Sequence, residues 1–239
     1  MPNPFDLNCD LGEGEPWKHT KALLGTITSA NIACGGHAGD LDTMTRCVRT
    51  ALKLKVRIGA HPGWPDRASS GRKDIHVAPA AFSEMLLNQI GALAAVCAAH
   101  GARLHHIKVH GFLYHACERR PTIRKALVAA MLEYWPRVIL YCMAGGTTAS
   151  EARAAGLRVW EEAFVDRAYA SATRLVPRGE PNALLVRREA VDQARTLLSA
   201  RAVAIAGGVA VLPGLRTLCV HSDSPDALYL ARAIHRGCR

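Results

Sequence analysis

Five polar side chains stand where a short apolar run of the sequence gives way to a turn. They are Asp10, His37, His61, His110 and His221. A short β-branched run that ends in a polar residue and a turn is typical of a buried parallel strand. Parallel strands deliver the residues at their carboxyl ends to one side of a sheet or barrel. We therefore expect the five side chains to surround one pocket.

Imidazole and carboxylate groups around one pocket support two kinds of chemistry. They could bind a divalent metal ion with water at an open coordination position, and Asp10, His61 and His110 are the residues predicted for that role. They could instead act as general acids and bases, because an imidazole titrates near neutral pH. Spacing along the sequence does not separate the two, so both remain open.

Charged residues near the same strand ends enlarge the predicted site. Lys108 lies two residues before His110 and therefore on the same face of its strand. A lysine within an apolar strand is seldom buried without a carboxylate partner or a function. It could neutralise a substrate carboxylate or an oxyanion, and the structural alternative is an ion pair with Asp10 or Asp166.

Two further pairs of polar residues follow the later strands. We interpret Asp166 and Arg167 as a carboxylate–guanidinium pair, and His221 and Asp223 as an imidazole–carboxylate pair. Arginine is suited to bidentate recognition of a carboxylate. The two pairs therefore add to the candidate pocket.

Alternating strands and helices must position these residues. Strands are expected at about residues 6–10, 27–34, 56–60, 104–109, 138–142, 158–164 and 217–221. Helices are expected at residues 18–24, 41–54, 79–100, 121–134, 150–155, 189–200 and 226–236. The helix over 41–54 has apolar residues at a 3.6-residue period, and Asp40 is its expected N-cap.

Seven strand–helix units without a break in composition predict a single α/β domain over residues 1–239. We expect a closed, TIM-like parallel βα barrel, because polar residues end most of the strands. In an open, doubly wound sheet the site would gather at one switch point.

Composition narrows the class of protein. The net charge of +10 is spread over isolated basic pairs, whereas nucleic-acid binding depends on clustered cations, so we expect no nucleic-acid partner. No apolar run approaches the roughly 20 residues that cross a bilayer, and no signal peptide is recognisable, so we expect a cytoplasmic protein. The eight cysteines contain no CxxC motif and predict free thiols. The glycine-rich segments 12–14 and 35–39 match neither the Rossmann nor the P-loop spacing.

Several segments resemble the LamB/YcsF family, whose members form the A subunit of the prokaryotic 5-oxoprolinase. The segments are residues 6–13, 29–40, 59–63, 89–93, 108–114, 166–169, 175–178 and 219–221. They include Asp-Leu-Asn-Cys-Asp-Leu-Gly-Glu in the first segment and Gly-Ala-His-Pro-Gly in the third. The resemblance runs from residue 6 to about residue 235, in order and with compatible gaps.

The resemblance implies a seven-stranded βα barrel similar to the sugar deacetylases. It also implies ATP-dependent opening of 5-oxo-L-proline to L-glutamate, with the 5-oxoprolinase subunits B and C as partners and ATP as the cofactor in their presence. Together with the strand-end pattern, it gives a predicted catalytic set of Asp10, His37, His61, Lys108, His110 and Asp166. The predicted substrate-binding set is Asn8, Asn31, Arg167, Arg178, His221 and Asp223.

In the implied reaction, phosphorylation of the amide oxygen by ATP would make the carbonyl carbon easier to attack. His61, His110 or Asp10 would deprotonate the attacking water. Lys108 or Arg167 would steady the oxyanion or the substrate carboxylate, and another histidine would protonate the leaving nitrogen.

Several positions depart from the usual family pattern, among them residues of the segments 68–72 and 221–224 and four single positions. Gly36 stands in place of Phe, Val109 of Pro, Phe112 of a small residue and His115 of Asn. Two other functions stay open: a divalent-metal-dependent hydrolase of amide or N-acetyl groups, and a non-catalytic protein that binds a small acid. Assembly into a homo-oligomer also stays open.

Overall fold

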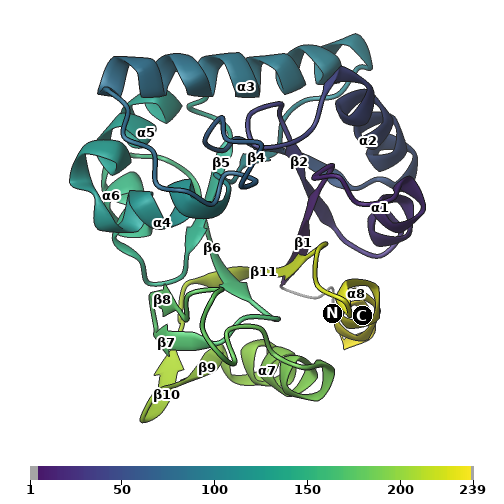
Figure 1. The fold of residues 1–239 in the computed structure, drawn as a ribbon, viewed down its shortest axis with the longest axis vertical. Coiled ribbons are helices and arrows are strands. Elements are labelled where there is room, and N and C mark those ends of the chain that lie inside the picture. Colours follow the sequence, from purple (N-terminus) through teal and green to yellow (C-terminus); the bar gives the residue numbers. More distant parts are fainter. Residues whose placement is uncertain (1–4, 238–239) are drawn as a thin grey trace.

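Seven parallel strands form a closed barrel in the computed structural model, which describes residues 5–237 (Figure 1). Their order around the barrel is β1-β11-β6-β5-β4-β3-β2. The strands are β1 (Asp6–Leu11), β2 (Ser29–Ala33), β3 (Arg57–His61), β4 (His106–Ile107), β5 (Ile139–Met143), β6 (Val159–Phe164) and β11 (Leu215–His221). The expected TIM-like parallel barrel is therefore confirmed.

Helices surround the barrel on its outside. They are α1 (Trp17–Leu24), α2 (Leu41–Leu54), α3 (Pro79–Ala99), α4 (Gly111–Arg119), α5 (Pro121–Tyr134), α6 (Thr147–Ala154), α7 (Arg187–Ala200) and α8 (Ala227–Gly237). The sequence pattern did not predict α4. This helix begins directly after His110, which makes no side-chain capping bond, and Gly111 has a φ of +55°. The usual start signal of a helix is therefore missing there.

A second sheet lies outside the barrel, beside α7 (Figure 1). Its order is β10-β9-β7-β8, with β7 (Tyr169–Ser171), β8 (Arg174–Leu175), β9 (Ala202–Ile205) and β10 (Gly208–Val211). The sequence pattern did not predict these strands, because two to four residues are too few for an alternating pattern to stand out.

The inside of the barrel is polar. Side chains alternate along a strand, so Asp6, Asn8 and Asp10 of β1 share the inward face. At the amino-terminal end of the barrel, Asp6 accepts hydrogen bonds from the hydroxyls of Ser29, Tyr141 and Thr217. The floor beneath the carboxyl-terminal mouth is thus a stack of hydrogen-bonded layers.

The middle layer links strands that lie on different sides of the barrel. Asn8 Nδ2 donates to Glu162 Oε1 at 2.8 Å, and Asn31 Nδ2 donates to Asn8 Oδ1 at 2.7 Å. His106 Nε2 donates to Asn31 Oδ1 at 2.6 Å. A Cβ at Gly59 would lie 2.1 Å from this His106 nitrogen, so only glycine leaves room for the imidazole.

Helix α3 has 21 residues and, among the described residues, is the one helix long and apolar enough to cross a membrane by length and composition. It packs on α2, α5 and β3. Its side chains Phe82, Leu86 and Leu93 are fully buried there. One face of this helix is therefore buried against its neighbours.

The seven described cysteines are buried free thiols. Burial raises the pKa of Cys34 and of Cys47 to about 12 and of Cys97 to about 11. A thiol with so high a pKa stays protonated and unreactive near neutral pH. Cys238 lies outside the described residues.

Candidate active site

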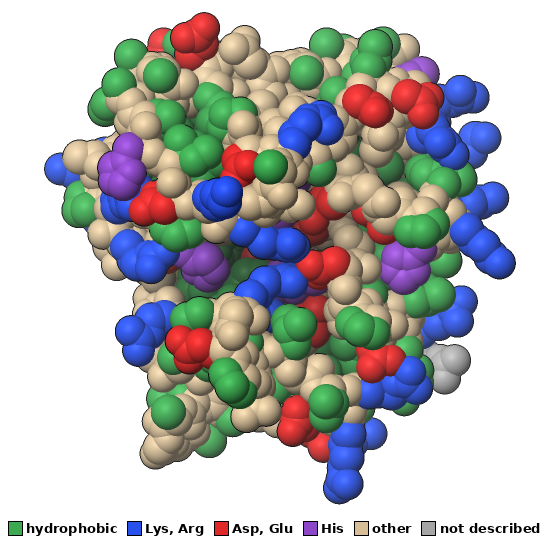
Figure 2. Space-filling view, viewed as in Figure 1, with side chains coloured by type: hydrophobic (Ala, Val, Ile, Leu, Met, Phe, Trp, Pro, Cys, Tyr) green, Lys and Arg blue, Asp and Glu red, His purple; other side chains and the backbone are tan. Residues whose placement is uncertain are grey.

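A cavity of about 710 Å³ opens at the carboxyl ends of the barrel strands. Residues of β7 and β8 form part of its wall, so the small sheet completes it. Figure 2 shows a hollow on this face with basic, acidic and histidine side chains around it. The cavity is lined by eight of the predicted site residues: Asp10, His61, Lys108, His110, Arg167, Arg178, His221 and Asp223.

Three imidazoles surround the carboxylate of Glu13 at one side of the cavity. Glu13 Oε1 lies 2.9 Å from His37 Nε2 and 3.0 Å from His110 Nδ1. The third nitrogen, His61 Nε2, lies 3.5 Å from the same oxygen. The rings of His37 and His110 stack with centroids 3.7 Å apart, and the His61 ring stands edge-on to both.

Backbone carbonyls hold the outer ring nitrogens of two of these histidines. His61 Nδ1 lies 2.7 Å from Lys108 O, and His110 Nε2 lies 2.9 Å from Ser70 O. A carbonyl oxygen can only accept, so each outer nitrogen carries the proton. In the neutral rings, the inner nitrogens His61 Nε2 and His110 Nδ1 therefore present lone pairs, and they lie 3.0 Å apart.

Lys108 and Asp10 form a buried ion pair at the floor of the cavity. Lys108 Nζ donates to Asp10 Oδ1 at 2.9 Å and lies 3.0 Å from Glu162 Oε1. Asn31 Nδ2 donates to the same Asp10 oxygen at 2.7 Å. The second carboxylate oxygen, Asp10 Oδ2, lies 3.4 Å from His61 Nε2. The floor thus holds one cation between two carboxylates.

Burial and charge oppose each other in setting the pKa values of the site. Burial alone would raise the pKa of Asp10, but His61 and Lys108 hold this pKa well below its usual value. Burial would likewise raise the pKa of Glu13, and His110 holds it well below the usual value. Burial lowers the pKa of His37 to about 4. Near neutral pH both carboxylates are therefore ionised, while His37 is neutral.

Across the cavity, His221 pairs with Asp166. His221 Nδ1 donates to Asp166 Oδ1 at 2.8 Å, and the backbone N–H of His221 donates to Asp166 Oδ2 at 3.1 Å. Burial would raise the pKa of Asp166, but His221 lowers it. The carboxylate therefore fixes the imidazole and leaves Nε2 as the nitrogen that can exchange a proton.

The two pairs predicted from adjacent sequence positions were wrong. Arg167 donates to the carbonyls of Ala183 and Val176, not to Asp166. Asp223 pairs with two arginines, Arg72 and Arg178, not with His221. Strand β11 ends at His221 and Asp223 lies in the turn that follows, so the alternation of a strand does not bring their side chains to the same side.

Comparison with known proteins places this fold and site in a family. Residues 5–239 match the model of the LamB/YcsF family. A Bordetella pertussis protein named as the A subunit of 5-oxoprolinase is 40% identical over 237 residues, which cover 97% of this chain and 94% of that protein. A Bordetella parapertussis protein of the same name gives the same identity and coverage.

The chain belongs to the LamB/YcsF family. The crystal structure of a lactam utilization protein from Thermus thermophilus superposes with a TM-score of 0.88 at 36% identity, covering 97% of this chain and 94% of that one. A GH113 β-1,4-mannanase reaches a TM-score of 0.52 at 11% identity, covering 100% of this chain and 97% of that one. The mannanase shares the fold alone.

Four predicted site residues of this LamB/YcsF chain lie behind the cavity wall. They are Asn8, Asn31, His37 and Asp166. All four are buried, and each bonds to another polar group of the site or of the barrel interior. They are placed to hold the lining residues in position.

Two carboxylates of the site, Glu13 and Glu162, were not predicted from the sequence. Glu13 follows β1 in a Gly-Glu-Gly turn, the same strand-end pattern that singled out the predicted residues. Glu162 is fully buried and lies in β6 among apolar residues, which is the signal that singled out Lys108. Both signals were therefore present in the sequence of this family member.

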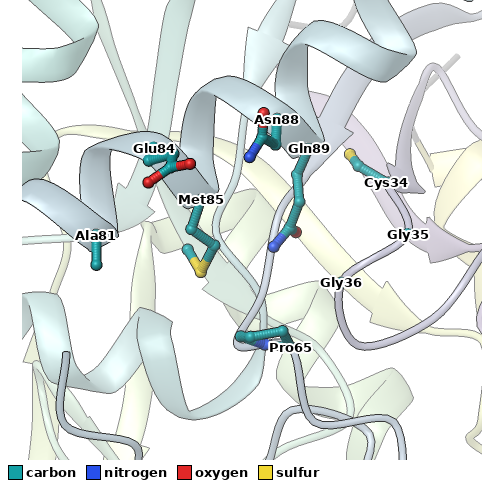
Figure 3. A pocket seen from close by; sticks show the side chains of 9 residues that line it. All are labelled: Cys34, Gly35, Gly36, Pro65, Ala81, Glu84, Met85, Asn88 and Gln89. Atoms are coloured by element: carbon teal, nitrogen blue, oxygen red, sulfur yellow. The ribbon is translucent and has the colours of Figure 1, made fainter.

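A second cavity, of about 480 Å³, lies beside α3 (Figure 3). A Cβ at Gly36 would lie 2.4 Å from Gln89 Oε1, and Gln89 in turn bonds to the backbone of Gly63 at 3.0 and 2.9 Å. Gly36 therefore makes room for the Gln89 side chain. None of the predicted site residues lines this cavity, so the larger cavity is the candidate active site.

Proposed function

We propose that this chain is the A subunit of an ATP-dependent 5-oxoprolinase, which opens 5-oxo-L-proline to L-glutamate. The observation that carries the proposal is the larger cavity, where an ionised carboxylate, several imidazoles and arginines face one space. The 40% identity to the two Bordetella proteins named for 5-oxoprolinase supports the same reaction. The name of the Thermus thermophilus structure, a lactam utilization protein, also refers to a cyclic amide.

The cavity suits a small anionic lactam. Its volume of about 710 Å³ lies within the usual range for small-molecule sites. Arg167 is buried in its wall, and Arg178 stands at the wall with its side chain 28% exposed. We propose that these guanidinium groups bind the substrate carboxylate, since arginine matches carboxylate geometry.

We propose that Asp10 and His221 move protons during ring opening. Asp10 Oδ1 is held by Lys108 and Asn31, so Oδ2 is the oxygen proposed to take a proton from the attacking water. As the new C–O bond forms and the ring C–N bond breaks, His221 Nε2 gives a proton to the leaving nitrogen. Lys108 supplies the positive charge nearest the oxyanion.

The low pKa of Asp10 makes its carboxylate a weak base, which fits a substrate activated beforehand. ATP would supply that activation by phosphorylating the amide oxygen. Opening of the ring then leaves an acyl phosphate on the new carboxyl carbon, and a second water cleaves it to L-glutamate and inorganic phosphate. The glycine-rich segments of the chain carry no P-loop. We therefore propose that ATP is bound with the help of the partner subunits B and C. We also propose that the complex acts in the cytoplasm.

The test is 5-oxoproline-dependent ATP hydrolysis by the chain together with its two partner subunits. We expect Asp10→Asn and His221→Asn to lower kcat by at least about 100-fold. The control is His100→Ala, an exposed histidine at the end of α3, which should keep the wild-type rate. Wild-type rates from an Asp10→Asn, His61→Ala double variant would reject the site, and no substrate-dependent ATP hydrolysis by the complete complex would reject the reaction.

A further inference from the structure

We propose that Glu13, His37, His61 and His110 bind one divalent transition-metal ion in the wall of the larger cavity. The proposal stands on the arrangement of these four side chains and does not depend on the 5-oxoprolinase reaction. Each offers one ligand atom, and the four atoms lie within 4.8 Å of one another.

The spacing of the ligand atoms matches a metal site. Bonds of about 2.0–2.1 Å place neighbouring ligands roughly 2.9–3.4 Å apart in octahedral or tetrahedral geometry. The distances from Glu13 Oε1 to the nitrogens of His37, His110 and His61 are 2.9, 3.0 and 3.5 Å. The distance between His61 Nε2 and His110 Nδ1 is 3.0 Å. Four of the ligand–ligand distances therefore already fall at or close to this range.

The hydrogen bonds of the outer ring nitrogens of His61 and His110 favour a cation between their inner ring nitrogens. His61 and His110 each direct their outer N–H to a backbone carbonyl, at 2.7 and 2.9 Å. Metal-binding histidines commonly make this bond, because it fixes the tautomer and turns the other nitrogen to the ion. With their inner lone pairs 3.0 Å apart beside a carboxylate, the rings repel each other unless a cation lies between them. That cation is either a metal ion or an extra proton on His110.

His37 completes the set. Its side chain is buried, and its Nδ1 has no hydrogen-bond partner among the described residues. With the ring proton on Nδ1, Nε2 would present its lone pair to the ion beside Glu13 Oε1, which lies 2.9 Å away. A Cβ at Gly63 would lie 2.6 Å from this Nδ1, and one at Gly71 would lie 2.9 Å from His37 Cβ. Two glycines thus let the backbone pack closely on the ring and fix its position.

The ligand types indicate which metals would bind. Three imidazoles and one carboxylate suit zinc, cobalt, nickel or iron, whereas magnesium and calcium prefer oxygen ligands. The set differs from the Asp10, His61 and His110 set expected from the sequence. Glu13 takes the place of Asp10 as the carboxylate ligand, because Glu13 Oε1 lies within 3.5 Å of all three imidazole nitrogens. Asp10 Oδ2 lies 3.4 Å from His61 Nε2, and Asp10 Oδ1 is bonded by Lys108 and Asn31.

The test measures metal content and binding on the full chain without substrate. The protein is stripped with a chelator, dialysed against Zn²⁺ or Co²⁺, and analysed by mass spectrometry. We expect about one ion per chain, and for Co²⁺ visible absorption of a site with nitrogen ligands. In Glu13→Gln and His110→Gln the content should fall at least about tenfold, since each removes a direct ligand. The matched control is His115→Asn, which lies in the cavity wall outside the cluster and should keep the ion.

Folding of each variant is checked by circular dichroism. Stabilisation by the metal is measured as a rise in Tm on adding Zn²⁺, and wild type and His115→Asn should both show that rise. Folded wild-type protein that retains neither ion would overturn the proposal and leave a protonated His110 as the cation. Equal binding by wild type and a folded Glu13→Gln, His61→Gln double variant would overturn it as well. Neither result would touch the 5-oxoprolinase assay, which is run with ATP and the partner subunits.

Discussion

At the floor of the cavity, one ammonium group joins strands that lie far apart in the sequence. Lys108 Nζ contacts Asp10 of β1, Glu162 of β6 and the sulfur of Cys219 of β11. Burial would lower the pKa of Lys108, but Asp10 keeps it well above its usual value. The charge balance of the barrel interior therefore depends on this residue.

Replacing Lys108 by methionine should destabilise the fold strongly. Lys108→Met keeps the bulk of the side chain but leaves Asp10 and Glu162 as buried carboxylates without a cation. Breaking a buried pair in this way costs about 3–5 kcal/mol in the free energy of unfolding, measured by urea titration. The exposed Lys53→Met of α2 is the control and should stay within about 0.5 kcal/mol. A loss below about 1 kcal/mol for Lys108→Met would contradict the account.

Gly59 offers a second test at the level of one residue. In Gly59→Ala the new Cβ would meet His106 Nε2 and force the imidazole away from Asn31. Overpacking of this kind costs about 1–3 kcal/mol, or a Tm lower by several degrees. Gly91→Ala in α3 has no heavy atom within 4 Å of the new Cβ and should raise Tm slightly. Equal Tm values for the two variants would refute the packing argument.

At the level of elements, regular patterns were predictable and short ones were not. Helix α2 was predicted over its full span, because its apolar residues recur at the helical period and Asp40 caps it. Strand β4 was predicted over 104–109 but spans only His106–Ile107. The ladder nevertheless continues, since Lys108 N donates to Ala60 O at 3.0 Å and His110 N to Pro62 O at 2.8 Å.

The cap of α2 can be tested directly. Asp40 accepts from the backbone N–H of Thr43 at 2.8 Å, and this bond satisfies one of the free donors of the first turn. Asp40→Ala should lower Tm by about 2–4 °C, measured by calorimetry. Asp42→Ala, two positions along, removes an exposed contact with Arg46 at 3.6 Å and a negative charge in the first turn, and it should change Tm less. A smaller effect at Asp40 than at Asp42 would argue against the cap.

For the whole molecule, the barrel and the rim of polar residues could be predicted from the sequence. The pairing of each imidazole with a particular carboxylate could not. The strand-end pattern placed His61, His110 and His221 at one mouth, because that pattern depends only on local order. Which carboxylate each imidazole meets depends on how strands close in space. In the structure, Glu13 contacts His110 and Asp166 contacts His221, and no local sequence pattern predicts these two pairs.

Stability should fall in mild acid because buried imidazoles cannot be charged without cost. Burial lowers the pKa of His106 well below its usual value of 6.5. Below about pH 6.5 the unfolded chain binds a proton that the folded chain does not, so the free energy of unfolding decreases as pH falls toward the folded pKa. One such group contributes at most about 1.4 kcal/mol per pH unit.

Urea unfolding between about pH 7.5 and pH 4.5 measures this dependence. The contribution of His106 to the free energy of unfolding should be constant above about pH 6.5. Below that pH, the free energy of unfolding should decrease as the pH is lowered. His106→Gln keeps a donor for Asn31 but does not titrate, so its slope against pH should be smaller than that of wild type. Identical slopes would show that His106 is not held neutral by the fold.

Because the barrel is closed, each of its strands is paired on both sides, whereas the small sheet has an end strand that is paired on one side. Strand β10 stands at the end of its sheet, with Val209 and Val211 each 67% exposed. An outer strand with free backbone groups and exposed valines is a template for pairing with another chain. In concentrated solution, aggregation should therefore start at β10, and Val209→Lys should reduce light scattering while leaving the barrel intact.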